Sequence, residues 1–192
     1  MSSIVVNIDV ADFEGNGLDI IGTEAADTLF GTNDGELIDG LGGNDFLSAS
    51  DADDFIIGGD GFDTIGGGAG ADTILGGNDG DLIFAHDGDD VVDTGEGNDI
   101  IYGGKGSDIL FGGAGQDEFV FELADFAEGE IDIIADFEQG EDKLIIKGLS
   151  DQDAVAFDTA TGSVSVNGRE IISFDEVVGF DSGDSPEDFE LL

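Results

Sequence analysis

Apolar residues recur at a fixed spacing of nine positions through more than half of the chain. They are Leu29, Ile38, Leu47, Ile56, Ile65, Ile74, Ile83, Val92, Ile101, Leu110 and Phe119. An acidic residue stands two positions before each of them: Asp27, Glu36, Asp45, Asp54, Asp63, Asp72, Asp81, Asp90, Asp99, Asp108 and Asp117. A fixed period indicates a repeat architecture, in which each unit buries its apolar residue only when its neighbours stack on it.

Small residues fill the first four positions of each unit. The segments 58–66 and 67–75 fit the pattern Gly-Gly-x-Gly-x-Asp-x-apolar-x, and 112–117 repeats its first six positions. Glycine permits a tight turn with positive φ, and the apolar residue points inward from a strand. The pattern predicts a six-residue turn and a three-residue strand in each unit, with two units completing one coil.

This unit resembles the calcium-binding nonapeptide of the repeats-in-toxin (RTX) or haemolysin-type family. The resemblance covers 99 residues, 22–120. It implies an all-β fold, a right-handed parallel β-roll (a β-helix or solenoid) of about eleven nonapeptide half-turns. A C-terminal β-rich cap would close the roll.

The flanking segments predict three regions: an N-terminal capping strand within residues 1–21, the calcium-binding β-roll at 22–120, and a C-terminal cap with a secretion signal at 121–192. Residues 3–10 alternate apolar and polar side chains, as a capping strand would. Residues 131–146 contain two strand-like runs around a glycine turn, and 164–172 predict a hairpin at Asn167-Gly168. Ser185-Pro186 predicts a helix start in a tail that resembles the uncleaved type I secretion signal of this family.

The charge of the chain must keep it expanded, attract a basic partner or be neutralised by cations. Against 47 Asp and Glu there are 4 Lys and Arg, a formal net charge of −43. Nucleic acid is excluded as a partner because the chain has too few Lys and Arg side chains to neutralise phosphates. The chain has no cysteine for disulfides, no run of about 20 apolar residues for a membrane span, and no cleavable signal in residues 1–12.

Stacking places the acid of one unit above the acid two units earlier, so that Asp63 lies over Asp81 and Asp72 over Asp90. Bare carboxylates would repel there, whereas Ca²⁺, which takes about 6–8 oxygen ligands, would join them. Magnesium demands a stricter octahedral shell and zinc prefers nitrogen and sulfur, and the chain has one His and no Cys. The gaps between loops allow several ions, up to about nine.

The predicted metal ligands are the eleven acidic residues named above together with loop carbonyls. The carbonyls belong to Gly59, Gly61, Gly68, Gly70, Gly77, Asp79, Gly95, Gly97, Gly104, Gly106, Gly113 and Gly115. Three units depart from the pattern: 31–39 carries Glu36, 49–57 lacks glycine in its loop, and 85–93 has His86 where glycine is usual. Sites in 58–81 and 94–117 are therefore expected to be the best formed.

The sequence does not favour an enzyme, because no nucleophile, metal-water or phosphate-loop motif is present. We expect a secreted, extracellular calcium-binding structural or matrix protein that folds on binding Ca²⁺. Exposed phenylalanines of the repeats would offer a surface for a homopolymer. The alternative is a calcium-dependent folding and type I secretion module of a larger secreted enzyme or adhesin, with the secretion machinery as its partner; a soluble calcium buffer is a weaker third reading.

Overall fold

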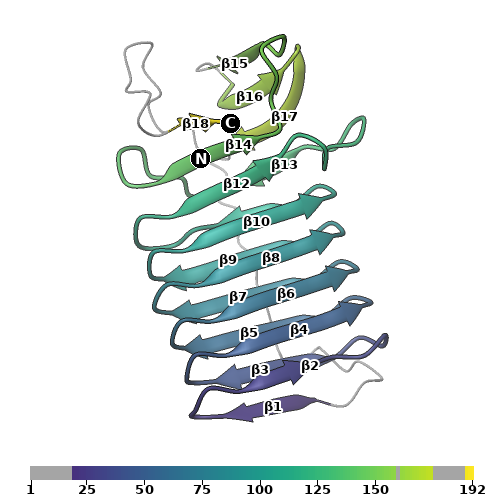
Figure 1. The fold of residues 1–192 in the computed structure, drawn as a ribbon, viewed down its shortest axis with the longest axis vertical. Helices are drawn as coiled ribbons and strands as arrows, with labels where there is room; N and C mark the ends of the chain where they lie inside the picture. The colour runs from purple at the N-terminus through teal and green to yellow at the C-terminus, as the bar shows by residue number, and fades with distance from the viewer. Residues whose placement is uncertain (1–18, 159–160, 175–188) are drawn as a thin grey trace.

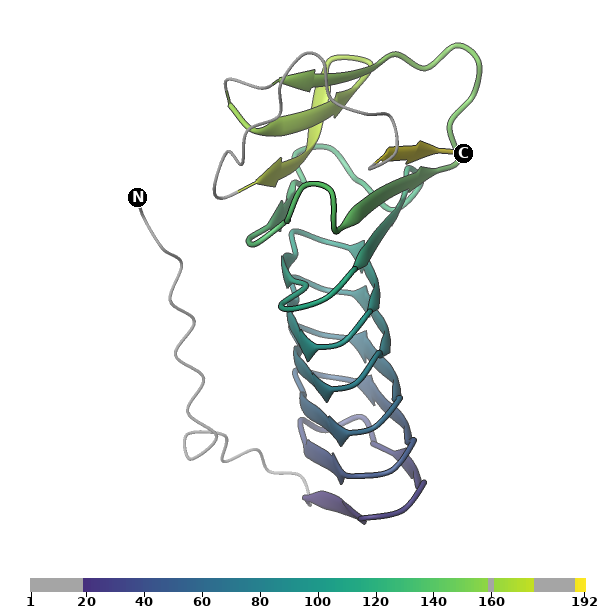
Figure 2. The same ribbon diagram turned by 90° about the vertical axis from the view of Figure 1, so that its left-hand side faces the viewer.

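The chain folds into a flattened coil of strands. The computed structural model describes residues 19–158, 161–174 and 189–192, and these contain eighteen strands and no helix. From β1 to β14 the chain passes from one sheet to the other after every strand (Figure 1). The second view shows the two sheets facing each other across a narrow interior, with the cap at one end (Figure 2). The all-β, parallel β-roll expected from the repeats is confirmed.

The first sheet contains ten strands and the second contains eight. In order across the first sheet they are β1 (Ile20–Thr23), β3 (Leu37–Leu41), β5 (Phe55–Asp60), β7 (Thr73–Asn78), β9 (Val91–Glu96), β11 (Ile109–Phe111), β13 (Asp132–Ile134), β17 (Arg169–Phe174), β16 (Ser163–Val166) and β15 (Val155–Asp158). In the second sheet they are β18 (Phe189–Leu191), β14 (Lys143–Lys147), β12 (Glu118–Glu122), β10 (Ile100–Lys105), β8 (Leu82–Asp87), β6 (Thr64–Ala69), β4 (Phe46–Asp51) and β2 (Thr28–Phe30).

Neighbouring strands of the roll are parallel and lie 18 residues apart in the chain, as in the pairs Ile56 with Ile74 and Ile65 with Ile83. One coil is therefore two nonapeptides, as predicted. The apolar residue of each unit points into the space between the sheets, and from Ile38 to Phe119 every one of these side chains is 0% exposed. This column is the hydrophobic core.

The strands are longer than the sequence predicted. From β5 to β10 each has six residues, and only three residues join it to the next strand. The prediction of a three-residue strand and a six-residue turn was therefore wrong. Glycines at the first two positions let successive coils approach closely, so that pairing continues into the glycine segment, for example from Gly59 to Gly77.

Both sheets continue beyond the last nonapeptide. Strand β13 pairs with β11 and then with β17, and β14 pairs with β12 and then with β18. The two strand-like runs of 131–146 thus belong to opposite sheets. Division of the chain at residues 21 and 120 stays a prediction, since hydrogen bonding crosses the second boundary.

The C-terminal hairpin is confirmed: β16 and β17 are antiparallel, with Asn167 and Gly168 at φ 55° and 79° in the turn. Residues 189–191 form β18, which pairs with β14. Ser185, Pro186 and the expected capping strand of residues 3–10 lie outside the described residues.

Three of the four cations tie the cap to itself and to the roll. The Lys143 ammonium pairs with Glu190, and Lys147 Nζ lies 3.1 Å from the Tyr102 hydroxyl. Arg169 donates to the carbonyl of Phe126 at 3.2 Å, across the loop between β12 and β13. These contacts join β14 to β18 and β10, and β17 to that loop.

Candidate calcium site

The acidic residues of the repeat form two hydrogen-bonded ladders, one along each edge of the roll. The backbone N–H of each acid donates to Oδ1 of the acid one coil later, at 2.8 Å from Asp45 to Asp63 and from Asp63 to Asp81. The second ladder has the same geometry, at 2.8 Å from Asp54 to Asp72. The stacking of carboxylates expected from the period is therefore present in the fold.

The second oxygen of these carboxylates has no partner. From Asp45 to Asp117 the repeat aspartates are at most 3% exposed. Their Oδ2 atoms are buried and lack a hydrogen bond among the described residues: those of Asp45, Asp54, Asp63, Asp72, Asp81, Asp90, Asp99, Asp108 and Asp117. An unpaired buried carboxylate oxygen is costly, and a bound cation would remove that cost at these atoms.

Burial changes the acidity of these carboxyl groups. Desolvation is the largest cause, and it raises the pKa of Asp81 and Asp90 to about 8. The negative charge of the stacked neighbours raises both further, while a backbone N–H that donates to each carboxylate opposes the shift. The pKa of Asp63 and of Asp72 rises to about 6 for the same leading reason. Without a counter-ion, the fold therefore disfavours the charged form of these four aspartates.

Main-chain carbonyls of the loops face the adjacent coil. A Cβ at Gly77 would lie 2.1 Å from the carbonyl oxygen of Gly59, and a Cβ at Gly97 would lie 2.1 Å from that of Asp79. The same relation holds for the carbonyls of Gly70, Gly77, Gly95 and Gly97. Six of the twelve predicted carbonyl ligands thus point at the next loop of their stack. The others, Gly61, Gly68, Gly104, Gly106, Gly113 and Gly115, occupy the equivalent second and fourth loop positions.

This donor set fits Ca²⁺. Calcium accepts carboxylate and carbonyl oxygens at roughly 2.3–2.6 Å in an adaptable shell. Groups of three or more His, Cys, Asp or Glu side chains that could hold a metal do not occur among the described residues. A site here would therefore combine carboxylates of successive coils with main-chain oxygens. That every predicted residue is a ligand stays a prediction.

The first acid of each ladder differs from those that follow. Oδ2 of Asp27 accepts the backbone N–H of Thr23 at 2.7 Å, and Oε2 of Glu36 accepts that of Thr32 at 3.1 Å. Both carboxylates are thus closed by a local hydrogen bond instead of being left open for a cation. The predicted ligands Asp27 and Glu36 therefore differ in their hydrogen bonding from the repeat aspartates that follow them.

Loops in which another residue replaces glycine at the second or fourth position keep the geometry of the others under strain. Ser50 and His86 at the second position have φ of 96° and 80°, and Ala52 and Asp79 at the fourth have φ of 85° and 71°. Residues with a Cβ rarely adopt this left-handed region. Stacking against the neighbouring coils therefore holds these loops in shape, and their backbone is locally strained.

Three acids of the cap lie outside the nine-residue period and were not predicted from it. Asp132 and Asp142 accept the backbone N–H of Asp108 and Asp117, at 2.9 and 3.1 Å, and so continue the two ladders. They lie 24 and 25 residues after those partners instead of 18, because longer connections intervene. The Asp-x-apolar triplets 132–134 and 142–144 were the available signal. Asp136 instead accepts the N–H groups of Gly112 and Gly113.

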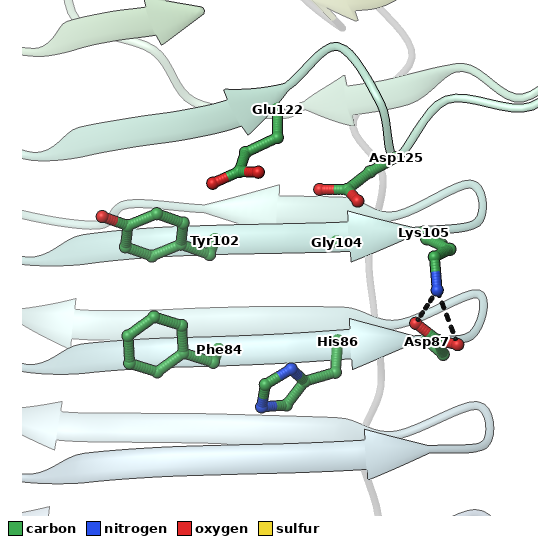
Figure 3. Close-up of a pocket in the computed structure, with 8 residues that line it drawn as sticks. All are labelled: Phe84, His86, Asp87, Tyr102, Gly104, Lys105, Glu122 and Asp125. Atoms are coloured by element: carbon green, nitrogen blue, oxygen red, sulfur yellow. Dashed lines mark hydrogen bonds and ion pairs between the residues drawn. The ribbon is translucent and has the colours of Figure 1, made fainter. Parts of the chain in front are cut away.

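A hollow of about 210 Å³ lies on the outer face of the second sheet (Figure 3). The rings of Phe84 and Tyr102 line it with centroids 4.8 Å apart, and Lys105 pairs with Asp87 at 2.7 Å on its rim. His86 also lines it and stacks on Phe84. The lining residues include no serine, threonine or cysteine that His86 could activate as a nucleophile.

The fold and the ladders define a class: a parallel β-roll whose loops present stacked carboxylates and carbonyls to cations. The family model described as RTX calcium-binding nonapeptide repeat (4 copies) matches residues 19–47, 30–65, 48–83, 66–101 and 84–119. These matches span more than half of the chain, and the chain belongs to this family. It is therefore a calcium-binding repeat protein.

Two solved structures are similar to the chain. The extracellular lipase LipA from Serratia marcescens is 16% identical with a TM-score of 0.40, over 91% of this chain and 40% of the lipase chain. The AlgE6R3 subunit of the Azotobacter vinelandii mannuronan C5-epimerase is 20% identical with a TM-score of 0.28, over 91% of both chains. The chain thus spans less than half the length of the lipase. No curated protein sequence matches it.

Proposed function

We propose that this protein is a secreted, extracellular structural protein whose folding is switched on by calcium. The observation that carries the proposal is the pair of ladders of buried aspartates with unpartnered Oδ2 atoms. Where Ca²⁺ is scarce, the charge of −43 opposes the compact state. Where Ca²⁺ is abundant, its binding to the native loops supplies folding free energy.

Export in the unfolded state follows from this switch. A chain that stays unfolded in a low-calcium cytosol can be threaded through a type I secretion channel, and it folds on reaching external calcium. The chain has no cysteine for disulfides, which supports the idea that bound ions stabilise its fold outside the cell. The secretion machinery is accordingly the proposed partner during export.

Self-assembly is the second part of the proposal. Among the described strands, β1 pairs only with β3 and β2 only with β4, so within the described residues one edge of each of these strands has no neighbouring strand. Exposed apolar side chains lie there: Ile21 is 50% exposed, Phe30 62% and Phe46 44%. Open edges with apolar neighbours are templates for pairing with another chain. A second copy stacked on this end, in place of the capping strand expected from residues 3–10, would extend the coil.

The alternative is a calcium-folding and secretion module of a larger enzyme or adhesin. The supporting observation is that the hollow on the second sheet offers His86 no nucleophile to activate, so any catalysis would belong to another domain. We propose that these 192 residues have no catalytic activity of their own.

A calcium titration followed by far-UV circular dichroism and light scattering tests these readings, with magnesium as the control. A cooperative gain of β signal with calcium alone supports the folding switch. Scattering that rises with it, and falls in Phe30→Ser, supports assembly through the first coil. A β signal already complete in chelator would overturn the switch, and a monomer at saturating calcium would favour the module.

A further inference from the structure

The two ladders of acids have four ends, and three of them are closed in the same way. The carboxylates of Asp27, Glu36 and Asp142 each accept the backbone N–H of the residue four positions earlier, at 2.7, 3.1 and 2.7 Å. Their outer oxygen is thus satisfied by the local chain. No further ligand is required at these three ends.

The fourth end, Asp132, is open. Its Oδ1 accepts the N–H of Asp108 at 2.9 Å, as in every coil below. Its Oδ2 is buried without a hydrogen-bond partner among the described residues, and the side chain is 0% exposed. The carboxylate one coil below, that of Asp108, is also 0% exposed and also has an unpartnered Oδ2.

The surroundings of Asp132 supply further negative charge and hold the loop in place. Glu130 and Asp125 are close enough to act electrostatically on Asp132. The loop before β13 is fastened by Arg169 to the Phe126 carbonyl, and by the N–H of Ile131 to Ser107 Oγ at 3.3 Å. No cation of the described chain bonds to Asp132, so its charge is left for an external ion.

We propose that Asp108 and Asp132 bind a further Ca²⁺ beyond the nonapeptide array, at the junction of the roll and its cap. By the repeat pattern, the carbonyls of Gly104 and Gly106 are the main-chain oxygens available from the coil below. The proposal rests on the calcium-binding function above, but one of its two carboxylates, that of Asp132, lies outside both the eleven-unit repeat and the matched residues 19–119. Because β13 joins β11 to β17, this ion would make docking of the cap depend on calcium.

The test compares two isosteric variants of the full chain, Asp132→Asn and Asp142→Asn. The number of Ca²⁺ ions bound at saturation is measured by equilibrium dialysis with metal analysis. Asp132→Asn should bind one ion fewer than the wild-type chain, whereas Asp142→Asn, whose two oxygens already have donors, should bind the same number. An unchanged count in Asp132→Asn would overturn the proposal.

The outcomes separate this site from the repeats. A wild-type chain that binds no calcium would refute the proposed function as a whole, whereas equal counts in all three proteins would refute only the junction site. If Asp132→Asn does not fold in calcium, crystals of the wild-type chain decide the matter. A calcium anomalous peak between Asp108 and Asp132 supports the site, and its absence there, with peaks between the lower coils, overturns it.

Discussion

The backbone N–H of Asp63 donates to Oδ1 of Asp81 at 2.8 Å, while Oδ2 of Asp81 has no partner. From Asp45 to Asp117, one oxygen of each repeat carboxylate thus accepts a hydrogen bond from the preceding coil, and the other has no partner among the described residues. The hydrogen bond holds successive carboxylates in register, and a cation bound at the second oxygen would offset their mutual repulsion. This arrangement gives specific consequences for substitution and pH.

Replacing Asp81 with asparagine should weaken calcium-dependent folding. The amide keeps an oxygen for the N–H of Asp63, but it removes the negative oxygen that a cation needs. Loss of one site that is saturated about 100-fold above its Kd lowers the free energy of unfolding by about 2.7 kcal/mol. The calcium midpoint of the β signal in circular dichroism should rise. Asp151→Asn, an exposed position outside the ladders, is the control and should leave it unchanged.

In chelator, the folded form should be favoured by acid. Burial raises the pKa of Asp81 and Asp90 from its ordinary value of 3.8 to about 8. A group whose pKa is higher in the folded state contributes stability that is complete below its unfolded pKa and is lost as the pH rises through the folded pKa. The calcium-free chain should therefore show more β signal at pH 5 than at pH 8.5.

Calcium should reverse this pH dependence, since Ca²⁺ binds the ionised carboxylates and competes with protons. The calcium midpoint should accordingly shift to higher concentration as the pH falls from 8 to 5. Circular dichroism titrations at several pH values measure both effects. Equal β content at pH 5 and 8.5 in chelator would contradict the raised pKa values.

Replacing His86 with glycine should stabilise the roll. His86 has φ of 80°, a conformation that is strained for a residue with a Cβ. Relief of this strain should raise the free energy of unfolding by about 1 kcal/mol, even though the contact with the Phe84 ring is lost. Urea unfolding in saturating calcium measures the change. His86→Ala removes the same ring but keeps the Cβ, so a stabilised alanine variant would refute this explanation.

Two glycines of β6 should respond differently to the same substitution. At Gly68, with φ of 122°, a Cβ would lie 1.8 Å from the carbonyl oxygen of Ser50. At Gly66 its nearest neighbour would be His86 Nε2 at 3.6 Å, an ordinary contact. Gly68→Ala should therefore prevent or strongly weaken coil stacking, and Gly66→Ala should fold as the wild type does. Thermal unfolding in calcium compares them, and equal melting temperatures would show that coils can separate at the loops.

The sequence by itself determined the repeat, the core and the class of ligand. The spacing of nine placed Ile65, Ile83 and their equivalents in the interior, because a residue two positions after a turn acid must point inward in every unit. The same spacing predicted that acids two units apart stack on each other, because two units make one coil. The Asn167-Gly168 hairpin was equally local, since two residues with positive φ define that turn.

Only the tertiary structure decided where the ladders end and how each end is closed. Asp132 and Asp142 fall outside the period because the connections before them are longer, and register across a sheet is set by hydrogen bonds between strands. The strand lengths were also decided there, because glycines such as Gly59 and Gly77 pair only when another coil lies against them. Asp142 and Asp132 both follow the Asp-x-apolar pattern, yet one carboxylate meets the N–H of Glu138 and the other meets none. That difference depends on the path of the preceding loop, which no local sequence pattern encodes.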